Sequence, residues 1–472
     1  MSTLNGSAEG GPATAWGSEP HMTAMEAVMW RSEVDPRLRS DGLVMDLLES
    51  TPDWDRLVAG HEWATRLAPR LRQRVVEDAL NIGPPAWIST ELDMAYHLSR
   101  VRLAEGQGMD DVLELAAIMH MAPFDTARPL WQAMLVEGLP DGGSVYLLKV
   151  HHSITDGTGV IQLFDLLHSD RAEPTPDKKA PEAPALDPTG PTGLAVRRGL
   201  GLARGSVGGA ARAALGLGGR ALRTVTHPQD AVAYAASLAR VTKNQAEPSP
   251  LLRKRGLSRR LRVLEVPMAD LRAAGRAVGG SLNDAYLAGL LGGLREYHHR
   301  HGVEVDELPI ALPVSLRKGP DDVGGNRFAG AFIKGPVGEK DPAARMALLR
   351  ERVLAARDEP ALDFLSSTAP VMSRLPSGVL AGLTLKFSSG IDLQASNIPG
   401  IRRTAYLAGA RIRRMFIFGP VPGSAIMATL VSHEDVCCIT LATDTDAVPD
   451  PDVLVDCMRA GMDEVVALGG AS

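Results

Sequence analysis

Apolar residues follow two different spacings along the chain, and the change between them predicts where strands and helices lie. Residues 144–150 form a mostly apolar run after a Pro-Asp-Gly-Gly turn, which predicts a short strand buried on both faces. Residues 158–167, which begin after seven intervening residues, repeat apolar side chains at helical spacing, as do residues 54–80 and 110–121. We therefore expect helices in these three segments, the first of them entered from the strand.

The second half of the chain repeats this alternation. Ser281 precedes a long helical pattern that ends near residue 297, and serine is a favoured N-cap. Because strands and helices alternate in both halves, we expect an α/β chain with α+β layers. The other segments with strand patterns are 261–267, 310–315, 408–417, 424–431 and 435–442, and those with helical patterns are 268–278 and 452–467.

Length and composition suggest how the chain is divided. A chain of 472 residues is long enough for two domains or for one large, internally duplicated unit. A stretch rich in Pro and charged residues begins near residue 170 and is typical of an exposed linker. The predicted divisions are a disordered tail at 1–20, a first subdomain at 21–170, a linker and basic connector at 171–250, and a second subdomain at 251–472.

Charge and cysteine content narrow the classes of partner. The net charge is −6, which gives no basis for nucleic-acid binding. Residues 190–227 carry six arginines and no acidic residue, and indicate either a solvated connector or a surface for anionic lipid or substrate phosphates. No apolar run reaches about eighteen residues, so we expect any membrane contact to be peripheral. Cys437, Cys438 and Cys457 show neither a disulfide framework nor metal-ligand spacing, which favours a reducing cytoplasm.

The segment His151-His152-x-x-x-Asp156-Gly157 follows the buried strand and is the strongest candidate for chemistry. Neighbouring residues on an extended segment point to opposite sides, so only one of the two histidines can face a given cavity. Histidine, with a pKa of about 6.5, is the usual general base at neutral pH. Asp156-Gly157 predicts a tight turn out of the strand, in which the aspartate fixes the local geometry by pairing with an arginine.

Other interpretations of this cluster remain open from the residues alone. The chain has no Gly-x-Ser-x-Gly elbow, and the cysteines lack an activating neighbour, which favours direct attack by a substrate that a histidine deprotonates. A histidine in such a place is often structural, and a His-His-Asp cluster also occurs in metal sites, although further ligands are not evident here.

Several further motifs occur in an order that resembles one family. Together with the segment at 151–157, they resemble the bacterial wax ester synthase/diacylglycerol acyltransferase family, a branch of the chloramphenicol-acetyltransferase-like superfamily. The resemblance covers roughly residues 22–465. The other motifs are Pro129-Leu130-Trp131, Trp87 with Tyr96-His97, Asn283-Asp284, Pro313-Val314-Ser315-Leu316-Arg317 with Gly325-Asn326, and Ser396-Asn397-Ile398-Pro399-Gly400.

Three segments depart from the family pattern. Glu26 stands where an aspartate is usual, Ser153 where alanine is common, and Lys334-Gly335-Pro336 in place of a Leu-Pro pair. These departures leave the histidines intact and put the identity of the substrate in doubt.

The resemblance implies two chloramphenicol-acetyltransferase-like subdomains with mixed sheets and a central active-site tunnel. It implies His152 as the general base, His151 as a supporting residue and Asp156 as a structural residue, and we hypothesise Arg317 as the ion-pair partner of Asp156. Asn283 is a candidate for binding the oxyanion or for positioning. The expected substrate-binding residues are Gly157, Trp131, Ser315, Arg317, Asn326, Ser396 and Asn397.

The implied reaction transfers a fatty acyl group from acyl-CoA, the co-substrate, to a long-chain alcohol or a diacylglycerol, giving a wax ester or triacylglycerol. No other cofactor and no metal is expected. Alternatives are acylation of a specialised hydroxyl or amine from CoA or an acyl-carrier protein, a non-catalytic lipid-binding relative, and a metal-dependent hydrolase. We expect a cytoplasmic enzyme that contacts the inner face of the membrane or a lipid droplet peripherally.

Overall fold

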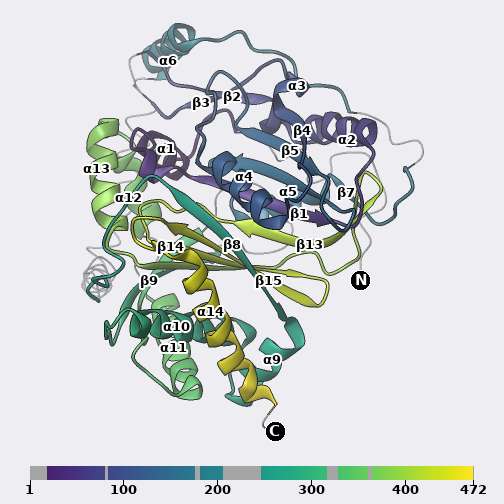
Figure 1. Cartoon of the computed structure of the whole chain (residues 1–472). Coiled ribbons are helices and arrows are strands. Elements are labelled where there is room, and N and C mark those ends of the chain that lie inside the picture. Colours follow the sequence, from purple (N-terminus) through teal and green to yellow (C-terminus); the bar gives the residue numbers. More distant parts are fainter. Residues whose placement is uncertain are drawn as a thin grey trace.

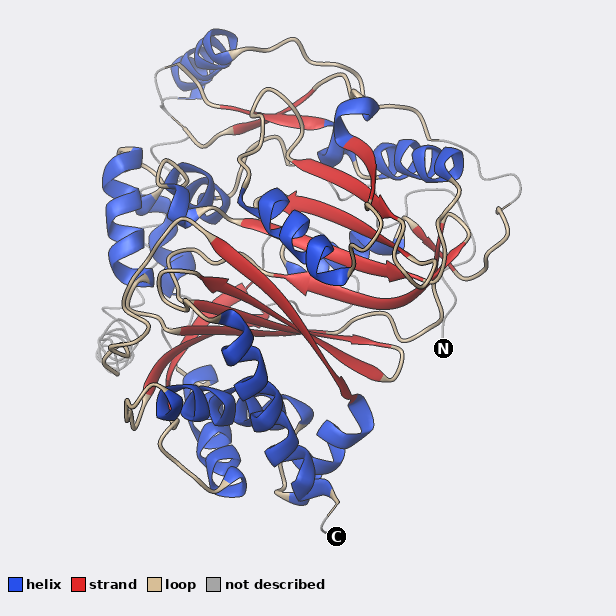
Figure 2. Ribbon diagram, viewed as in Figure 1, coloured by secondary structure: helices blue, strands red, loops and turns tan. Residues whose placement is uncertain are grey.

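The computed structural model describes residues 19–79, 83–175, 181–205, 246–315, 328–359 and 364–470. Two large mixed sheets lie one above the other, and helices cover their outer faces (Figures 1 and 2). The α/β prediction is therefore confirmed. The predicted disordered tail falls almost wholly on residues 1–18, outside the described residues.

The first sheet is built around the strand that precedes the paired histidines. This strand, β6 (Ser144–His151), is buried at every position, as predicted. The sheet has the order β4-β5-β6-β1-β13-β12-β7, with β4 and β5 parallel. The other strands are β1 (Asp41–Leu48), β4 (Leu98–Arg102), β5 (Trp131–Glu137), β7 (His168–Ser169), β12 (Tyr406–Leu407) and β13 (Ala410–Phe418).

Helices around the first sheet confirm two predictions and correct a third. The patterns at 110–121 and 158–167 correspond to α4 (Met109–Met121) and α5 (Gly157–Asp165). The pattern at 54–80 gives a helix, α2, only over Trp54–Leu67. Pro69 follows, and proline disfavours a helical conformation in the residue before it. The chain continues as a 3₁₀ turn (Pro69–Arg72) and as β2 (Gln73–Val76), which pairs with β3 (Ala86–Ser89).

The second sheet has the order β10-β9-β11-β14-β15-β8, in which β11 runs parallel to both neighbours. Ser281 caps α10 as predicted, because its hydroxyl accepts the Asp284 N–H at 3.3 Å and the Asp284 carboxylate accepts the Ser281 N–H at 2.8 Å. The strands are β8 (Arg259–Pro267), β9 (Leu308–Ser315), β10 (Phe328–Gly335), β11 (Leu393–Ile398), β14 (Ile426–His433) and β15 (Val436–Asp444), and the covering helices are α9 (Met268–Ala277), α10 (Leu282–Arg300), α11 (Pro342–Arg357) and α14 (Pro451–Val466).

Two strands from the second half of the chain, β12 and β13, lie in the first sheet. β13 pairs antiparallel with β1, with Met45 opposite Phe416. The strand predicted at 408–417 is therefore confirmed as β13. It joins the first sheet, whose other long strands come from much earlier in the chain. The predicted boundaries at 170 and 250 stay predictions, and the two halves share a sheet across them.

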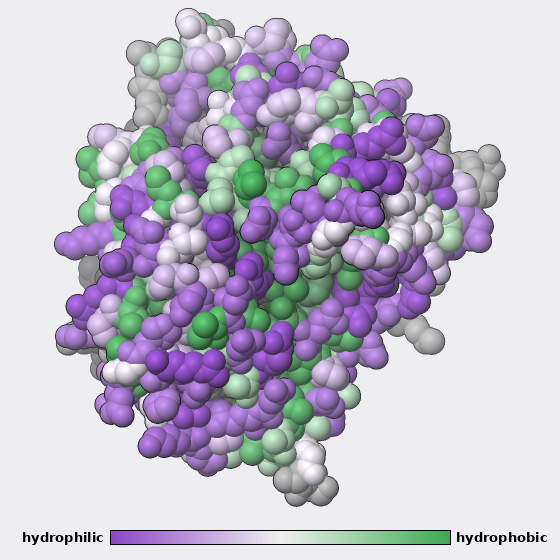
Figure 3. All heavy atoms as spheres, viewed as in Figure 1, coloured by the Kyte–Doolittle hydropathy of each residue, from purple (hydrophilic) through white to green (hydrophobic). Residues whose placement is uncertain are grey.

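Short helices close the edge of the molecule where the two sheets meet. They are α1 (Ala24–Ser32), α12 (Phe364–Met372) and α13 (Ser377–Ser388), which lie together in Figure 1. Figure 3 shows a largely polar face whose apolar side chains gather in the middle, between the two halves. Among the described helices, none is both long enough and apolar enough to cross a bilayer.

Candidate active site

A cavity of about 1300 Å³ lies between the two sheets, where the resemblance implies a tunnel. Its walls come from the end of β6, the start of β1, strands β9, β10, β11, β13 and β14, and helices α1, α5, α12 and α13. Most of the lining side chains are apolar. The polar ones include Ser40, His152, Asp156, Gln394, Ser396, Asn397 and Thr429.

The structure separates the two histidines. β6 ends at His151, and alternation along this strand places Tyr146, Leu148 and Val150 on one face. His152 continues that face and lines the cavity, partly buried. Its backbone N–H donates to the Ser40 carbonyl at 2.7 Å, which ties it to the residue before β1.

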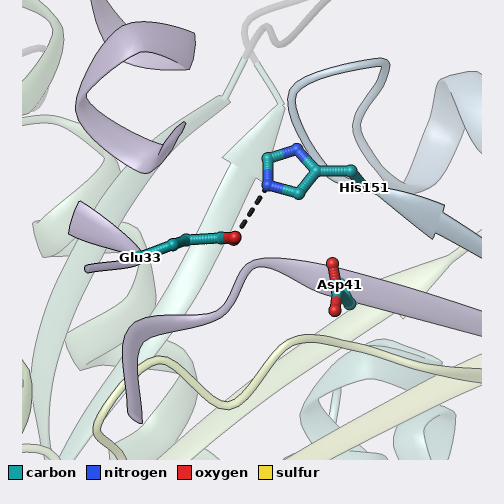
Figure 4. A group of neighbouring side chains, drawn as sticks. All are labelled: Glu33, Asp41 and His151. Carbon is teal, nitrogen blue, oxygen red and sulfur yellow. Dashed lines mark hydrogen bonds and ion pairs between the residues drawn. The ribbon is translucent and has the colours of Figure 1, made fainter. Parts of the chain in front are cut away.

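His151 lies on the opposite side, only 1% exposed. Its Nε2 is 2.8 Å from Glu33 Oε1 (Figure 4), and its Nδ1 accepts the Ser153 N–H at 3.0 Å. The Trp30 ring contacts it edge-on. Burial alone would lower the pKa of His151, but the Glu33 carboxylate outweighs burial and raises it. His151 is held on both ring nitrogens, away from the cavity.

Glu33, Asp41, Lys149 and His151 form a buried charge cluster behind β6. The Lys149 ammonium lies 2.9 Å from Asp41 Oδ2 and donates to the Ala122 carbonyl. Burial raises the pKa of Asp41 to about 6, although Lys149 opposes this shift. Burial alone would also raise the pKa of Glu33, but His151 and the Ser40 N–H lower it below its usual value.

Within the described ranges, Glu33, Asp41 and His151 are the only group of three or more that could hold a metal ion, with ligand atoms within 4.8 Å of one another. Lys149 already supplies a cation to Asp41, and both Ser40 and His151 already occupy Glu33 Oε1. An added divalent cation would be repelled by the ammonium. The cluster is therefore better described as an ion-pair network than as a metal site. On the cavity side of the histidine segment, the described residues offer no group of three metal ligands.

Asp156 and Gly157 shape the turn after the histidines. The Asp156 carboxylate caps α5 by accepting the Gly159 N–H at 3.0 Å, and the residue is 7% exposed. A Cβ on Gly157 would lie 2.6 Å from Ile398 Cδ1, so glycine permits α5 to approach β11 closely. Arg317 lies outside the described residues, and its ion pair with Asp156 stays a prediction.

The other predicted site residues divide between the cavity and its surroundings. Ser396 and Asn397 line the cavity, and the Asn397 amide donates to Asn283 Oδ1 at 3.2 Å. Asn283 therefore reaches the cavity through Asn397, and its role as an oxyanion donor stays a prediction. Ser315 ends β9, but its side chain, like Arg317 and Asn326, falls outside what the structure describes.

Trp131 requires a correction. It was predicted to bind substrate, but it lies in the core of the first half, 1% exposed and away from the cavity lining. Its indole N–H donates to the Leu71 carbonyl at 2.9 Å, and its ring stacks on His97 with centroids 4.5 Å apart. Trp131 begins β5, which pairs with β6, and its burial and contacts make it a packing residue.

Several cavity and cluster residues carried no recognisable sequence signal. Glu33 is a single acidic residue after α1, and Thr429 is a single polar residue in the middle of β14. Neither belongs to a motif or to a cluster along the sequence. Thr429 is fully buried, lines the cavity, and its hydroxyl oxygen has no hydrogen-bond partner among the described residues. Burial raises the pKa of Cys437 to about 11 and that of Cys438 to about 12, which leaves both thiols protonated at neutral pH.

Comparison with known families decides what this arrangement belongs to. Residues 21–286 match the wax ester synthase/diacylglycerol acyltransferase catalytic domain, and residues 324–465 match the C-terminal domain of the same family. The chain belongs to this family. It is accordingly an acyltransferase of the wax ester synthase/diacylglycerol acyltransferase type.

Curated relatives of this acyltransferase agree over nearly the whole chain. A protein of Mycobacterium tuberculosis (strain ATCC 25618 / H37Rv), named provisionally as a diacylglycerol O-acyltransferase, is 42% identical over 94% of this chain and 91% of its own length. Another protein of that strain with the same provisional name is 25% identical over 92% of this chain and 88% of its own length.

Solved structures share the fold. The wax ester synthase/diacylglycerol acyltransferase from Marinobacter aquaeolei VT8 aligns with a TM-score of 0.63 and 20% identity, over 96% of this chain and 100% of its own. The first condensation domain of the calcium-dependent antibiotic synthetase aligns with a TM-score of 0.62 and 16% identity, over 96% and 97%. At these identities the likeness shows the fold alone, and it supports the predicted chloramphenicol-acetyltransferase-like architecture.

Proposed function

We propose that this acyltransferase transfers a fatty acyl group from acyl-CoA to the hydroxyl group of an apolar acceptor, a long-chain alcohol or a diacylglycerol, with His152 as general base. One observation carries the proposal. His152 places an imidazole in the wall of a large, mostly apolar cavity that both sheets enclose. Such a cavity suits two apolar chains meeting at one base.

The proposed reaction needs one proton to move twice. His152 takes the acceptor hydroxyl proton as that oxygen attacks the thioester carbonyl carbon, which forms the new C–O bond and a tetrahedral oxyanion. Collapse of the oxyanion breaks the C–S bond, and His152 returns the proton to the leaving thiolate. The products are an ester and free CoA. Holding both reactants in one cavity supplies proximity, because a bimolecular step becomes effectively unimolecular.

Thiol release from palmitoyl-CoA tests this function, with hexadecanol or diolein as acceptor. We expect His152→Ala to lose about 10²–10⁴-fold in turnover, the usual contribution of a general base. His168→Ala is the matched control, because His168 is buried beside Asp46 in the same sheet and does not line the cavity. Full turnover in His152→Ala would overturn the proposal, and mass spectrometry of the ester product identifies the acceptor.

The proposed substrates also imply contact with a lipid surface. The part of the basic stretch at 190–227 that the structure describes is poorly suited to such contact, because two of its arginines form ion pairs. Arg197 pairs with Asp187 at 3.1 Å, and Arg198 forms an ion pair with the buried Asp78. Residues 206–227 lie outside the described residues. We propose instead that α12 and α13 face the lipid.

These two helices carry four exposed apolar side chains, Val371, Val379, Leu383 and Phe387. All of them except Val379 also line the cavity. From Phe364 to Ile391 the sequence has Arg374 and Lys386 but no acidic residue, which suits anionic lipid. Flotation with phosphatidylglycerol-containing vesicles tests the proposal. Leu383→Glu with Phe387→Glu should abolish flotation and Arg197→Glu should preserve it; the reverse result would return the surface to the basic stretch.

A further inference from the structure

Glu33 connects the two histidines although it does not line the cavity. One of its carboxylate oxygens, Oε1, accepts the Ser40 N–H at 2.6 Å and lies 2.8 Å from His151 Nε2. The Ser40 carbonyl in turn accepts the His152 N–H at 2.7 Å. We propose that Glu33 is a positioning residue that sets where His152 sits in the cavity wall. This proposal rests on the proposed function, in which His152 is the general base.

The backbone around His152 explains why it needs such support. The pairing of β1 with β6 ends at Asp41 opposite His151, so His152 lies one residue beyond the paired strands. Its bond to Ser40 is the continuation of that pairing. Ser40 is 5% exposed, and a buried N–H without an acceptor costs about 1–3 kcal/mol. If Glu33 is removed, Ser40 must turn toward another acceptor, and its carbonyl moves with it.

Glu33 also acts from the other side of the turn. It fixes the ring of His151, whose Nδ1 accepts the Ser153 N–H at 3.0 Å. The residues before and after His152 are thus held by one imidazole, and that imidazole is held by Glu33. Both supports of the His152 main chain therefore lead back to a single carboxylate.

The expected consequence falls on the chemical step. A general base misplaced by about 1 Å can cost about 10²-fold in rate, whereas binding of the acyl chain depends on the cavity walls. Since Glu33 is absent from those walls, its loss should lower kcat and leave the KM for acyl-CoA nearly unchanged. A purely structural role would lower the amount of folded enzyme without changing kcat per folded molecule.

The chain offers a matched control in a second buried carboxylate–histidine pair. Asp46 Oδ2 lies 3.0 Å from His168 Nε2, both side chains are fully buried, and neither lines the cavity. The variants are Glu33→Ala, Glu33→Asp and Glu33→Gln, with Asp46→Ala as the control. They are compared by kcat and KM with palmitoyl-CoA, and by the His152 ring resonance in histidine-labelled protein, assigned with His152→Ala.

We expect Glu33→Ala to lose about 10–100-fold in kcat with KM within about twofold, and to shift the His152 resonance. Glu33→Asp, which keeps the charge but shortens the reach, should show the same direction and serves if the alanine variant does not fold. Glu33→Gln keeps an acceptor oxygen and should restore most of kcat. Asp46→Ala should leave kcat per folded molecule and the His152 resonance unchanged.

Two results would overturn the proposal. One is an unchanged His152 resonance in both Glu33→Ala and Glu33→Asp, and the other is an equal loss of kcat in Asp46→Ala. Failure of the proposed function is visible separately, as retained turnover in His152→Ala. The resonance measurement still decides whether Glu33 positions His152 in that case, because it does not depend on activity.

Discussion

The two faces of β6 carry opposite kinds of environment within one strand. On one face, Tyr146, Leu148 and Val150 lie in an apolar core that continues to His152 at the cavity. On the other face, Lys149 and His151 enter the buried charge cluster with Asp41 and Glu33. Because side chains alternate along β6, its two faces have different roles. The apolar face leaves the His152 imidazole accessible from the cavity, and the charged face holds the end of the strand in place.

Breaking the cluster face should give the largest effect on stability. Lys149→Met leaves Asp41 without its cation, and removing one partner of a buried pair costs about 3–5 kcal/mol. The loss should be greatest at pH 8 and smaller at pH 5, because the pKa of Asp41 is about 6 with Lys149 present and rises further without it. Urea unfolding at both pH values measures this.

The surface pair of Arg262 and Asp452, 2.6 Å apart, supplies the control. Arg262→Met should cost less than about 1 kcal/mol at either pH. An equal loss in Lys149→Met at pH 5 and pH 8 would contradict the account of Asp41.

Acid should test both faces together, because a buried neutral histidine packs against each of them. His61 bonds to the Tyr146 hydroxyl at 2.6 Å, and His120 bonds to the Asp41 carbonyl at 2.8 Å. Burial lowers the pKa of each to about 4. The unfolded chain therefore takes up protons first below pH 6.5, and stability falls from there to about pH 4, by about 1.4 kcal/mol per pH unit for each histidine.

Asp41 acts in the opposite direction over part of this window. Its folded pKa of about 6 lies above the unfolded value, so the folded state gains a proton first as the pH falls below 6. Asp41 should therefore offset the contribution of about one of these histidines below pH 6. Urea unfolding at pH 7, 6 and 5 measures the slope, and His120→Gln should reduce it; an unchanged slope would show that His120 is not the titrating group.

Breaking the cavity face should give the smallest effect. Gly157→Ala places a methyl group against Ile398 and should cost about 1–3 kcal/mol, as overpacking usually does. Ile398→Val removes the contacting Cδ1 and should recover much of the loss in the double variant. Gly60→Ala, on α2 with no atom within 4 Å of the new Cβ, should cost nothing. Thermal unfolding of the wild type, Gly157→Ala, the double variant and Gly60→Ala measures these effects. A double variant no more stable than Gly157→Ala would contradict the contact with Ile398.

Local patterns were sufficient to predict elements whose cause is local. The apolar run at 144–150, the cap at Ser281 and the histidine segment all depend on residues within one turn or one strand. The helix at 54–80 was overextended because Leu71 keeps the helical spacing after Pro69 has ended the helix. Trp131 was misplaced because its motif marks the strand beside β6, and a motif does not say which face a side chain takes.

Long-range pairings could not be predicted from these patterns. Nothing local to Glu33 or Ser40 indicates that they support a histidine more than a hundred residues away. The same holds for the cavity wall from β11 and β14, where Thr429 lies in a strand that is buried at every position. These residues acquire their roles only when the two sheets come together.

The pairing of β1 with β13 also has a consequence for biosynthesis. The two strands are separated by more than 350 residues, so the central strand of the first sheet has one unpaired edge until the ribosome has made β13. An unpaired edge attracts other strands, and the growing chain is exposed to that hazard throughout translation. A chain released before residue 410 keeps its paired histidines but lacks the strand that closes the sheet beside them.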